Sequence, residues 1–258
     1  MAAYISFQPR DNFKTHLYTG TGASNAQSFP ETTAMQPDFT WIKNRDATDD
    51  SILTNSVVGA TKYLSSNENT AMTTNAESLK SFDSDGFTVG NMVNVNTNAE
   101  DYVSWNWKMG NTTGIDLDGA DLTPIAYSFN QTTGQSIIQW LGVSSSAPNT
   151  IPHGLGKVPD ILLLKNYTGV DTWAMYTKPT GNTMCLLLAS NDAEQENPGP
   201  GTVWNDTTPT ATKFTTGNNG RTAGGATEYL LAYCFSSIRG YSKFGSYTGN
   251  GNADGPFT

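Results

Sequence analysis

The stretch that decides the fold is Pro37–Arg45, PDFTWIKNR, because it recurs 122 residues later as Pro159–Tyr167, PDILLLKNY. The same segments surround both stretches in the same order. The first block contains HLYTG (16–20), SDGFTVG (84–90) and DYVSWNW (101–107), and the second contains IQWLG (138–142), ATKFTTG (211–217) and EYLLAYCF (228–235). Agreement in order and spacing over about eighty residues indicates an internal repeat.

The offset between the two blocks grows along the chain. It is 122 residues between Pro37 and Pro159, and 127 residues between Tyr102 and its match Tyr229. One small insertion in the second block explains the difference. A third block begins near the end, where FGSYTG (244–249) repeats the pattern of HLYTG.

The segments inside each block have the pattern of β-strands. Phe39, Trp41 and Lys43 alternate with Thr40, Ile42 and Asn44, which predicts a strand with two different faces. ILLLK (161–165) is continuously apolar and predicts a central strand covered on both faces. Turn residues separate the strands, and no long segment has a helical period. The sequence therefore predicts an all-β protein of tandem antiparallel β-sandwiches of the jelly-roll type.

Four regions follow from the repeat. Residues 1–110 form the first β-sandwich repeat and residues 135–240 form the second. Residues 111–134 have no counterpart after the second block and are expected to be an insertion or an interdomain hairpin. Residues 241–258 are expected to begin a third repeat or to form a C-terminal strand.

Composition excludes several classes of protein. The net charge of −9 and a pI near 4.5 leave no basic patch for nucleic acid. No apolar run is long enough to span a membrane, so no membrane insertion is expected. The first residues lack the pattern of a signal peptide. Cys185 and Cys234 lie among apolar residues and are expected to be buried free thiols.

Catalytic patterns are missing. His16 and His153 have no nucleophile beside them, and no GxSxG or HExxH motif occurs. Glu194 and Glu196 have the spacing of a paired-carboxylate glycosidase, but they lie in a Pro/Gly-rich segment that favours a solvated loop. We therefore expect a protein that is not an enzyme.

Two acidic clusters beside glycine turns offer hard oxygen ligands for calcium. They contain Asp83 and Asp85 in the first, and Asp116, Asp118 and Asp121 in the second. Neither matches the spacing of an EF-hand loop, and Asp-Gly turns also occur without metal. Calcium is thus the one cofactor the sequence suggests, and plain turns are the alternative.

Aromatic residues are the candidates for contact with carbohydrate. Trp173 and Trp204 stand next to polar residues and are expected to be exposed, where an indole can bind the apolar face of a sugar. Trp105 and Trp107 share one strand face and are expected to belong to the core, as are Tyr233 and Phe235 in the second block.

The chain resembles a repeat found in virion proteins of marine bacteriophages. The resemblance is carried by FKTHLYTGTG (13–22), PDFTWIKNRDATDD (37–50), GATKYLSSN (59–67), SLKSFDSDGFTVG (78–90), VNVNTNAEDYVSWNWK (93–108) and GYSKFGSYTGNGNADGPF (240–257). Those proteins are described as tail-fibre or structural proteins with concanavalin-A-like, laminin-G-like sandwiches. The resemblance implies that fold and a place on the particle surface, after synthesis in the cytoplasm of the bacterial host. It brings no catalytic or ligand residues with it.

Three functions remain open. A tail-fibre or adhesin-type protein would contact glycans of the host surface. A capsid decoration or a connector between fibre and tail would bind only other virion proteins. A polysaccharide depolymerase would need the carboxylate pair. The first two fit a homo-oligomer, because such particle proteins are symmetric assemblies.

Overall fold

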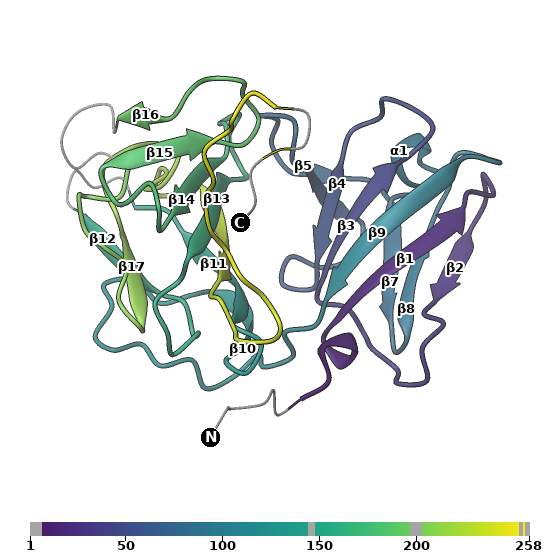
Figure 1. The fold of residues 1–258 in the computed structure, drawn as a ribbon, viewed down its shortest axis with the longest axis horizontal. Coiled ribbons are helices and arrows are strands. Elements are labelled where there is room, and N and C mark those ends of the chain that lie inside the picture. Colours follow the sequence, from purple (N-terminus) through teal and green to yellow (C-terminus); the bar gives the residue numbers. More distant parts are fainter. Residues whose placement is uncertain (1–6, 144–147, 197–202, 253–254, 256–258) are drawn as a thin grey trace.

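The structure is a computed structural model that describes residues 7–143, 148–196, 203–252 and 255. It is an all-β protein, as predicted, with antiparallel sheets (Figure 1), and these residues contain only two short helical turns. The helical turns are η1 (Pro9–Asp11) and α1 (Val93–Asn96). Among the described residues, no helix has the length and apolar character needed to cross a bilayer.

The first repeat is a sandwich of a six-stranded sheet on a three-stranded sheet. The large sheet has the order β1-β9-β3-β4-β5-β6 and the small one β2-β8-β7. Their strands are β1 (Phe13–Thr19), β2 (Asn25–Ser28), β3 (Phe39–Asn44), β4 (Ile52–Asn55), β5 (Lys62–Ser65), β6 (Thr73–Thr74), β7 (Leu79–Asp83), β8 (Gly86–Val89) and β9 (Asp101–Trp107).

The second repeat has the same plan. Its large sheet has the order β10-β11-β18-β13-β14-β15-β16, and β12 pairs with β17 in the small one. The strands are β10 (Ala126–Asn130), β11 (Gln135–Leu141), β12 (Asn149–Pro152), β13 (Ile161–Asn166), β14 (Ala174–Thr177), β15 (Met184–Leu187), β16 (Gln195–Glu196), β17 (Lys213–Thr216) and β18 (Tyr229–Phe235). Without β10, its order repeats that of the first large sheet strand for strand.

The ladders correct one detail of the sequence alignment. The Gly20 N–H donates to the Glu100 carbonyl, and the Gly142 N–H donates in the same way to Glu228. Glu100 and Glu228 are 128 residues apart, so the true counterpart of Tyr102 is Leu230 and not Tyr229. Burial agrees, because Tyr102 and Leu230 are both fully buried whereas Tyr229 is exposed.

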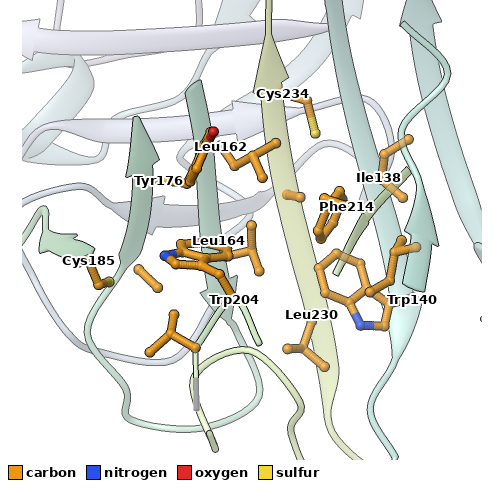
Figure 2. Close-up of a cluster of buried hydrophobic side chains, with 14 of the residues drawn as sticks. Ile138, Trp140, Leu162, Leu164, Tyr176, Cys185, Trp204, Phe214, Leu230 and Cys234 are labelled. Atoms are coloured by element: carbon orange, nitrogen blue, oxygen red, sulfur yellow. The ribbon is translucent and has the colours of Figure 1, made fainter. Parts of the chain in front are cut away.

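Each sandwich has its own core between its large and small sheets. In the second repeat, Leu162 and Leu164 of β13 pack with Trp140 and Phe214 (Figure 2). Leu163, between them, points to the opposite face and is also buried. The prediction that ILLLK is a central strand covered on both faces is confirmed. Ile42, Tyr102 and Phe87 belong to the corresponding core of the first repeat.

A third core joins the two repeats. The large sheets turn their outer faces, the faces away from the small sheets, toward each other, and the small sheets lie on the far sides (Figure 1). We call this contact the seam. The Phe39 ring lies 4.6 Å from the Tyr233 ring, and the Met72 N–H donates to the Tyr167 carbonyl. The two repeats therefore bury apolar surface against each other as well as within themselves.

The regions outside the repeats have distinct structures. Within 111–134, β10 forms a hairpin with β11 and so belongs to the second sheet. The described part of the C-terminal region, residues 241–252 and 255, forms no strand, so the expected C-terminal strand is not seen there. Phe244 packs on Phe235, and Ser242 makes an isolated bridge to Ile238, but Tyr247 is exposed and no described sheet pairs with residues 241–252. Cys185 and Cys234 are buried free thiols, as predicted.

Candidate functional site

An apolar pocket of about 400 Å³ opens at the seam. Its first wall comes from the outer face of the first large sheet and consists of Phe13, Phe39, Trp41 and Trp107. Trp107 lies at the centre of this wall, because its ring packs on Phe13 and Phe39 and also meets a ring of the second repeat.

The opposite wall belongs to the second repeat and consists of Ile161, Leu163, Met175, Leu188 and Phe235. These side chains share the outer face because every second residue of a strand points to the same side. The C-terminal segment closes one end with three further side chains, those of Tyr241, Ser242 and Phe244.

One polar side chain in this pocket lacks a full set of partners. The Gln135 amide nitrogen donates a 2.6 Å hydrogen bond to the Tyr241 hydroxyl. The Gln135 Oε1 atom is buried and has no hydrogen-bond partner among the described residues. Because this oxygen is shielded from solvent, it does not present an acceptor to the pocket. The lining of the pocket therefore suits an apolar or aromatic group.

A second, polar pocket of about 440 Å³ also lies between the repeats. The first repeat contributes Val57, Val58, Lys62, Ala71, Met72 and Thr74, and the second contributes Gln139, Tyr167 and Thr168. The pocket thus brings together an aromatic ring, an amide, hydroxyl groups and an ammonium group. Sugars are recognised by such a combination, with a ring against the apolar face and polar groups on the hydroxyls.

Tyr167 is the aromatic residue among those that line the polar pocket. Its hydroxyl accepts a 2.5 Å hydrogen bond from the Gln139 amide, and its ring stacks on that of Tyr229 at 5.9 Å. Burial raises the pKa of the Tyr167 hydroxyl, although the bond from Gln139 opposes this effect. The hydroxyl stays neutral at physiological pH and can both donate and accept.

The two tryptophans expected to be exposed are buried, so that prediction is wrong. Trp173 is 0% exposed, and its indole N–H donates to the Ser65 carbonyl across the seam. Trp204 is 1% exposed and packs edge-on against Tyr176 within the second core (Figure 2). Each indole fills space that strands distant in sequence enclose, Trp173 in the seam and Trp204 in the core of the second repeat.

Trp105 and Trp107, expected in the core, are only partly buried. Both lie on the outer face of β9, where Trp107 lines the apolar pocket. Trp105 meets the edge of Trp41 at 6.3 Å. The seam covers this face incompletely, so these rings lie at its margin.

The acidic residues proposed as calcium ligands are engaged by protein donors. Asp83 accepts hydrogen bonds from Ser81 and Thr88, and Asp85 accepts one from the Met35 N–H. No group of three or more metal-ligating side chains occurs within the described parts of the chain.

The second acidic cluster, within residues 111–134, bonds to the small sheet of the second repeat. Asp116 caps the Asp118 N–H, and Asp118 accepts a hydrogen bond from Thr212 and lies 3.7 Å from the Lys213 ammonium. Asp121 exchanges hydrogen bonds with Thr150. These hydrogen bonds and the nearby lysine lower the pKa of the Asp118 and Asp121 carboxyls.

The histidines have structural partners. His16 Nε2 lies 3.2 Å from the Gln27 side-chain oxygen. The buried His153 Nδ1 accepts from the Leu155 N–H, which assigns the proton to Nε2 and makes it the donor to the Thr210 carbonyl. Burial lowers the pKa of His153 to about 4, so the ring is neutral at physiological pH. Glu194 is exposed, and Glu196 lies in the two-residue strand β16, whose side chains are outside the described part of the structure.

Comparison with known proteins gives a family. The family model described as "Domain of unknown function (DUF7483)" matches residues 8–258. The chain belongs to this family. No curated protein matches the chain. A solved structure titled "Crystal Structure of the STIV MCP" is 9% identical over 89% of this chain and 86% of that one, with a TM-score of 0.22, too low to support any argument.

For this DUF7483 protein, the seam pockets could not be located from sequence alone. Tyr167 stands in the repeated stretch PDILLLKNY, and alternation along that strand gives its face. The sequence does not show that the outer faces of the two large sheets meet. It does indicate that something covers the outer face of the second sheet, because ILLLK (161–165) is apolar on both of its faces.

Proposed function

We propose that this protein is a non-enzymatic structural component of a bacteriophage particle, of the tail-fibre or adhesin type, that contacts host-surface glycan through the polar seam pocket. The virion assignment is supported by the sequence resemblance, which extends over nearly the whole chain, and it is compatible with the all-β fold. The glycan assignment depends on one observation, the meeting of Tyr167, Gln139 and Lys62 in a single hollow.

The chemistry of the polar pocket sets the kind of sugar. Lys62 is exposed at the pocket and carries a positive charge on a protein of net charge −9. An ammonium group beside a tyrosine ring and an amide favours a sugar that carries a carboxylate, such as a uronic acid unit. Repeated weak sites on an oligomer would increase the strength of attachment.

Fluorescent purified protein mixed with host cells tests this proposal. We expect binding that periodate treatment of the cells removes, and that falls at least about tenfold in Tyr167→Ala and Lys62→Ala. Lys157→Ala, which changes an exposed lysine outside the pocket, is the matched control and should bind as the wild type does. Binding that is insensitive to periodate, or unchanged in both pocket variants, would refute the glycan site.

A second candidate function is a capsid decoration or a connector between particle proteins, and the apolar pocket favours it. Eleven of its thirteen lining residues are apolar or aromatic, which suits a tyrosine or tryptophan side chain of another protein better than a sugar. Leu188→Trp would place a larger side chain in the pocket, and Leu141→Trp, at an exposed leucine of β11 outside the pocket, is the control. If this function holds, Leu188→Trp should reduce binding to empty particles while Leu141→Trp should not.

A further inference from the structure

β1 presents an open edge. It is the last strand of the first large sheet and pairs only with β9 among the described residues. The Gly20 N–H donates to Glu100 at one end of this ladder, and the Lys108 N–H donates to Asn12 at the other. Bonding alternates along an antiparallel pair, so even-numbered residues of β1 bond to β9. Phe13, Thr15 and Leu17 therefore direct their N–H and C=O groups to the open side.

The same edge is occupied in the second repeat. β11 is the counterpart of β1, and its residues Gln135, Ile137 and Gln139 are the counterparts of Phe13, Thr15 and Leu17 at an offset of 122. In the second repeat these residues pair with Asn130, Ser128 and Ala126 of β10. One molecule thus contains the same edge twice, once covered by an antiparallel strand and once uncovered.

The difference arises from the chain that precedes each strand. Before β11, Gly134 adopts a left-handed conformation with φ +67°, which lets a tight turn bring β10 back alongside. Before β1, Pro9 begins the short helix η1, and Asn12 has φ −129°. Phe7 instead reaches the C-terminal region, where its ring meets that of Tyr241 at 5.4 Å.

The open edge carries little of the usual protection against pairing. Proteins blunt such edges with charged side chains, prolines, bulges, short strands or charges that point inward. β1 has seven residues in unbroken register. Its one charged residue, Lys14, does point inward, but its ammonium lies 3.3 Å from Glu31 and donates to the Thr33 carbonyl, so this charge is already paired within the first repeat. Its exposed side chains are uncharged, and Leu17 is 61% exposed.

We propose that the β1 strands of two copies pair antiparallel at this edge and join their six-stranded sheets into one continuous sheet. The occupant must be a strand, because only a strand satisfies a row of alternating N–H and C=O groups. A second copy fits because a two-fold axis produces the antiparallel direction that β10 adopts on β11. It also brings the exposed Leu17 side chains to the interface.

Sedimentation of the wild-type protein over a range of concentrations, with hydrogen exchange of single amides, tests this pairing. We expect a dimer in which the Thr15 and Leu17 amides exchange slowly and become faster on dilution. The His16 amide, bonded within the monomer, should stay protected at every concentration and is the internal control. Leu17→Lys should raise the dissociation constant at least about tenfold, whereas Val170→Lys, a change at an exposed apolar residue elsewhere, should not.

Two results would overturn the proposal: a wild-type protein that remains monomeric at about 100 µM, or a dimer whose Thr15 and Leu17 amides exchange as fast as in the monomer. Circular dichroism of Leu17→Lys verifies that the variant is folded. The outcome is independent of the proposed function, because no residue of β1 lines the polar pocket. Cell binding of the monomeric variant can be measured separately.

Discussion

The side-chain amide of Asn55, at the end of β4, donates a 2.8 Å hydrogen bond to the hydroxyl of Tyr233, in β18 of the other repeat. Both side chains are buried, and burial raises the pKa of the tyrosine well above its usual range, so its hydroxyl is neutral. The Phe39 ring covers the tyrosine from the first repeat. A polar contact inside an apolar seam fixes how the two sheets meet, because only one alignment satisfies both groups.

Replacing Tyr233 with phenylalanine should destabilise the protein through the seam. The change keeps the ring but leaves the Asn55 N–H buried without its acceptor. We expect the free energy of unfolding to fall by about 1–3 kcal/mol. Urea unfolding followed by fluorescence measures this. Tyr247→Phe, at an exposed tyrosine, should leave stability unchanged, and an equally small effect at Tyr233 would contradict the importance of the bond.

Trp173 and Trp204 should behave as residues of stability and not of binding. Each fills space in a core, so Trp173→Ala and Trp204→Ala should lower the free energy of unfolding by about 3–5 kcal/mol. Thermal unfolding of each variant, compared with Val170→Ala at an exposed position, measures the difference. A variant that keeps its melting temperature but loses cell binding would restore a surface role for that indole.

Sequence periodicity is sufficient to predict a strand but not what covers it. Alternation of Phe39 and Trp41 with Thr40 and Ile42 correctly predicts β3, because strand faces depend only on neighbouring residues. The burial of Trp173 does not follow from its polar neighbours in sequence, because its hydrogen-bond acceptor is the carbonyl of Ser65, 108 residues away. Contacts across such distances depend on how sheets pack.

The same limit explains the shifted register and the missed pockets. Aligning Tyr102 with Tyr229 matches one tyrosine with another, but the hydrogen-bonded ladders make Leu230 the counterpart of Tyr102. The reason is that the connection between β17 and β18 is one residue longer than the connection between β8 and β9 in the first repeat. A shift of one residue exchanges the two faces of a strand, so Tyr229 and Leu230 exchange places. The face of Tyr167 is unaffected by this shift and follows from alternation along β13, but only the arrangement of both repeats makes that face part of a pocket.

Calcium should not stabilise the protein. The carboxyls of Asp118 and Asp121 already accept hydrogen bonds from Thr212 and Thr150, and Lys213 lies beside the first of them. A cation would have to displace these donors. We expect an unchanged melting temperature at roughly 1 mM calcium, the range in which weak extracellular sites fill. A rise that disappears in Asp121→Asn would instead identify a site at this linker.

His153 should make the protein less stable in mild acid. Burial lowers its pKa from 6.5 to about 4 in the folded state, whereas in the unfolded chain it takes up a proton near 6.5. Unfolding therefore binds a proton between these pH values, and the free energy of unfolding falls as the pH decreases from about 6.5 to about 4. This free energy falls by at most about 3 kcal/mol.

His153→Gln, which lacks the titrating ring but still has an N–H for the Thr210 carbonyl, should show a smaller loss of stability over this interval. Urea unfolding at pH 7.5 and pH 4.5 of wild type, His153→Gln and the control His16→Gln measures it. An equal acid sensitivity in wild type and His153→Gln would place the cause in other groups.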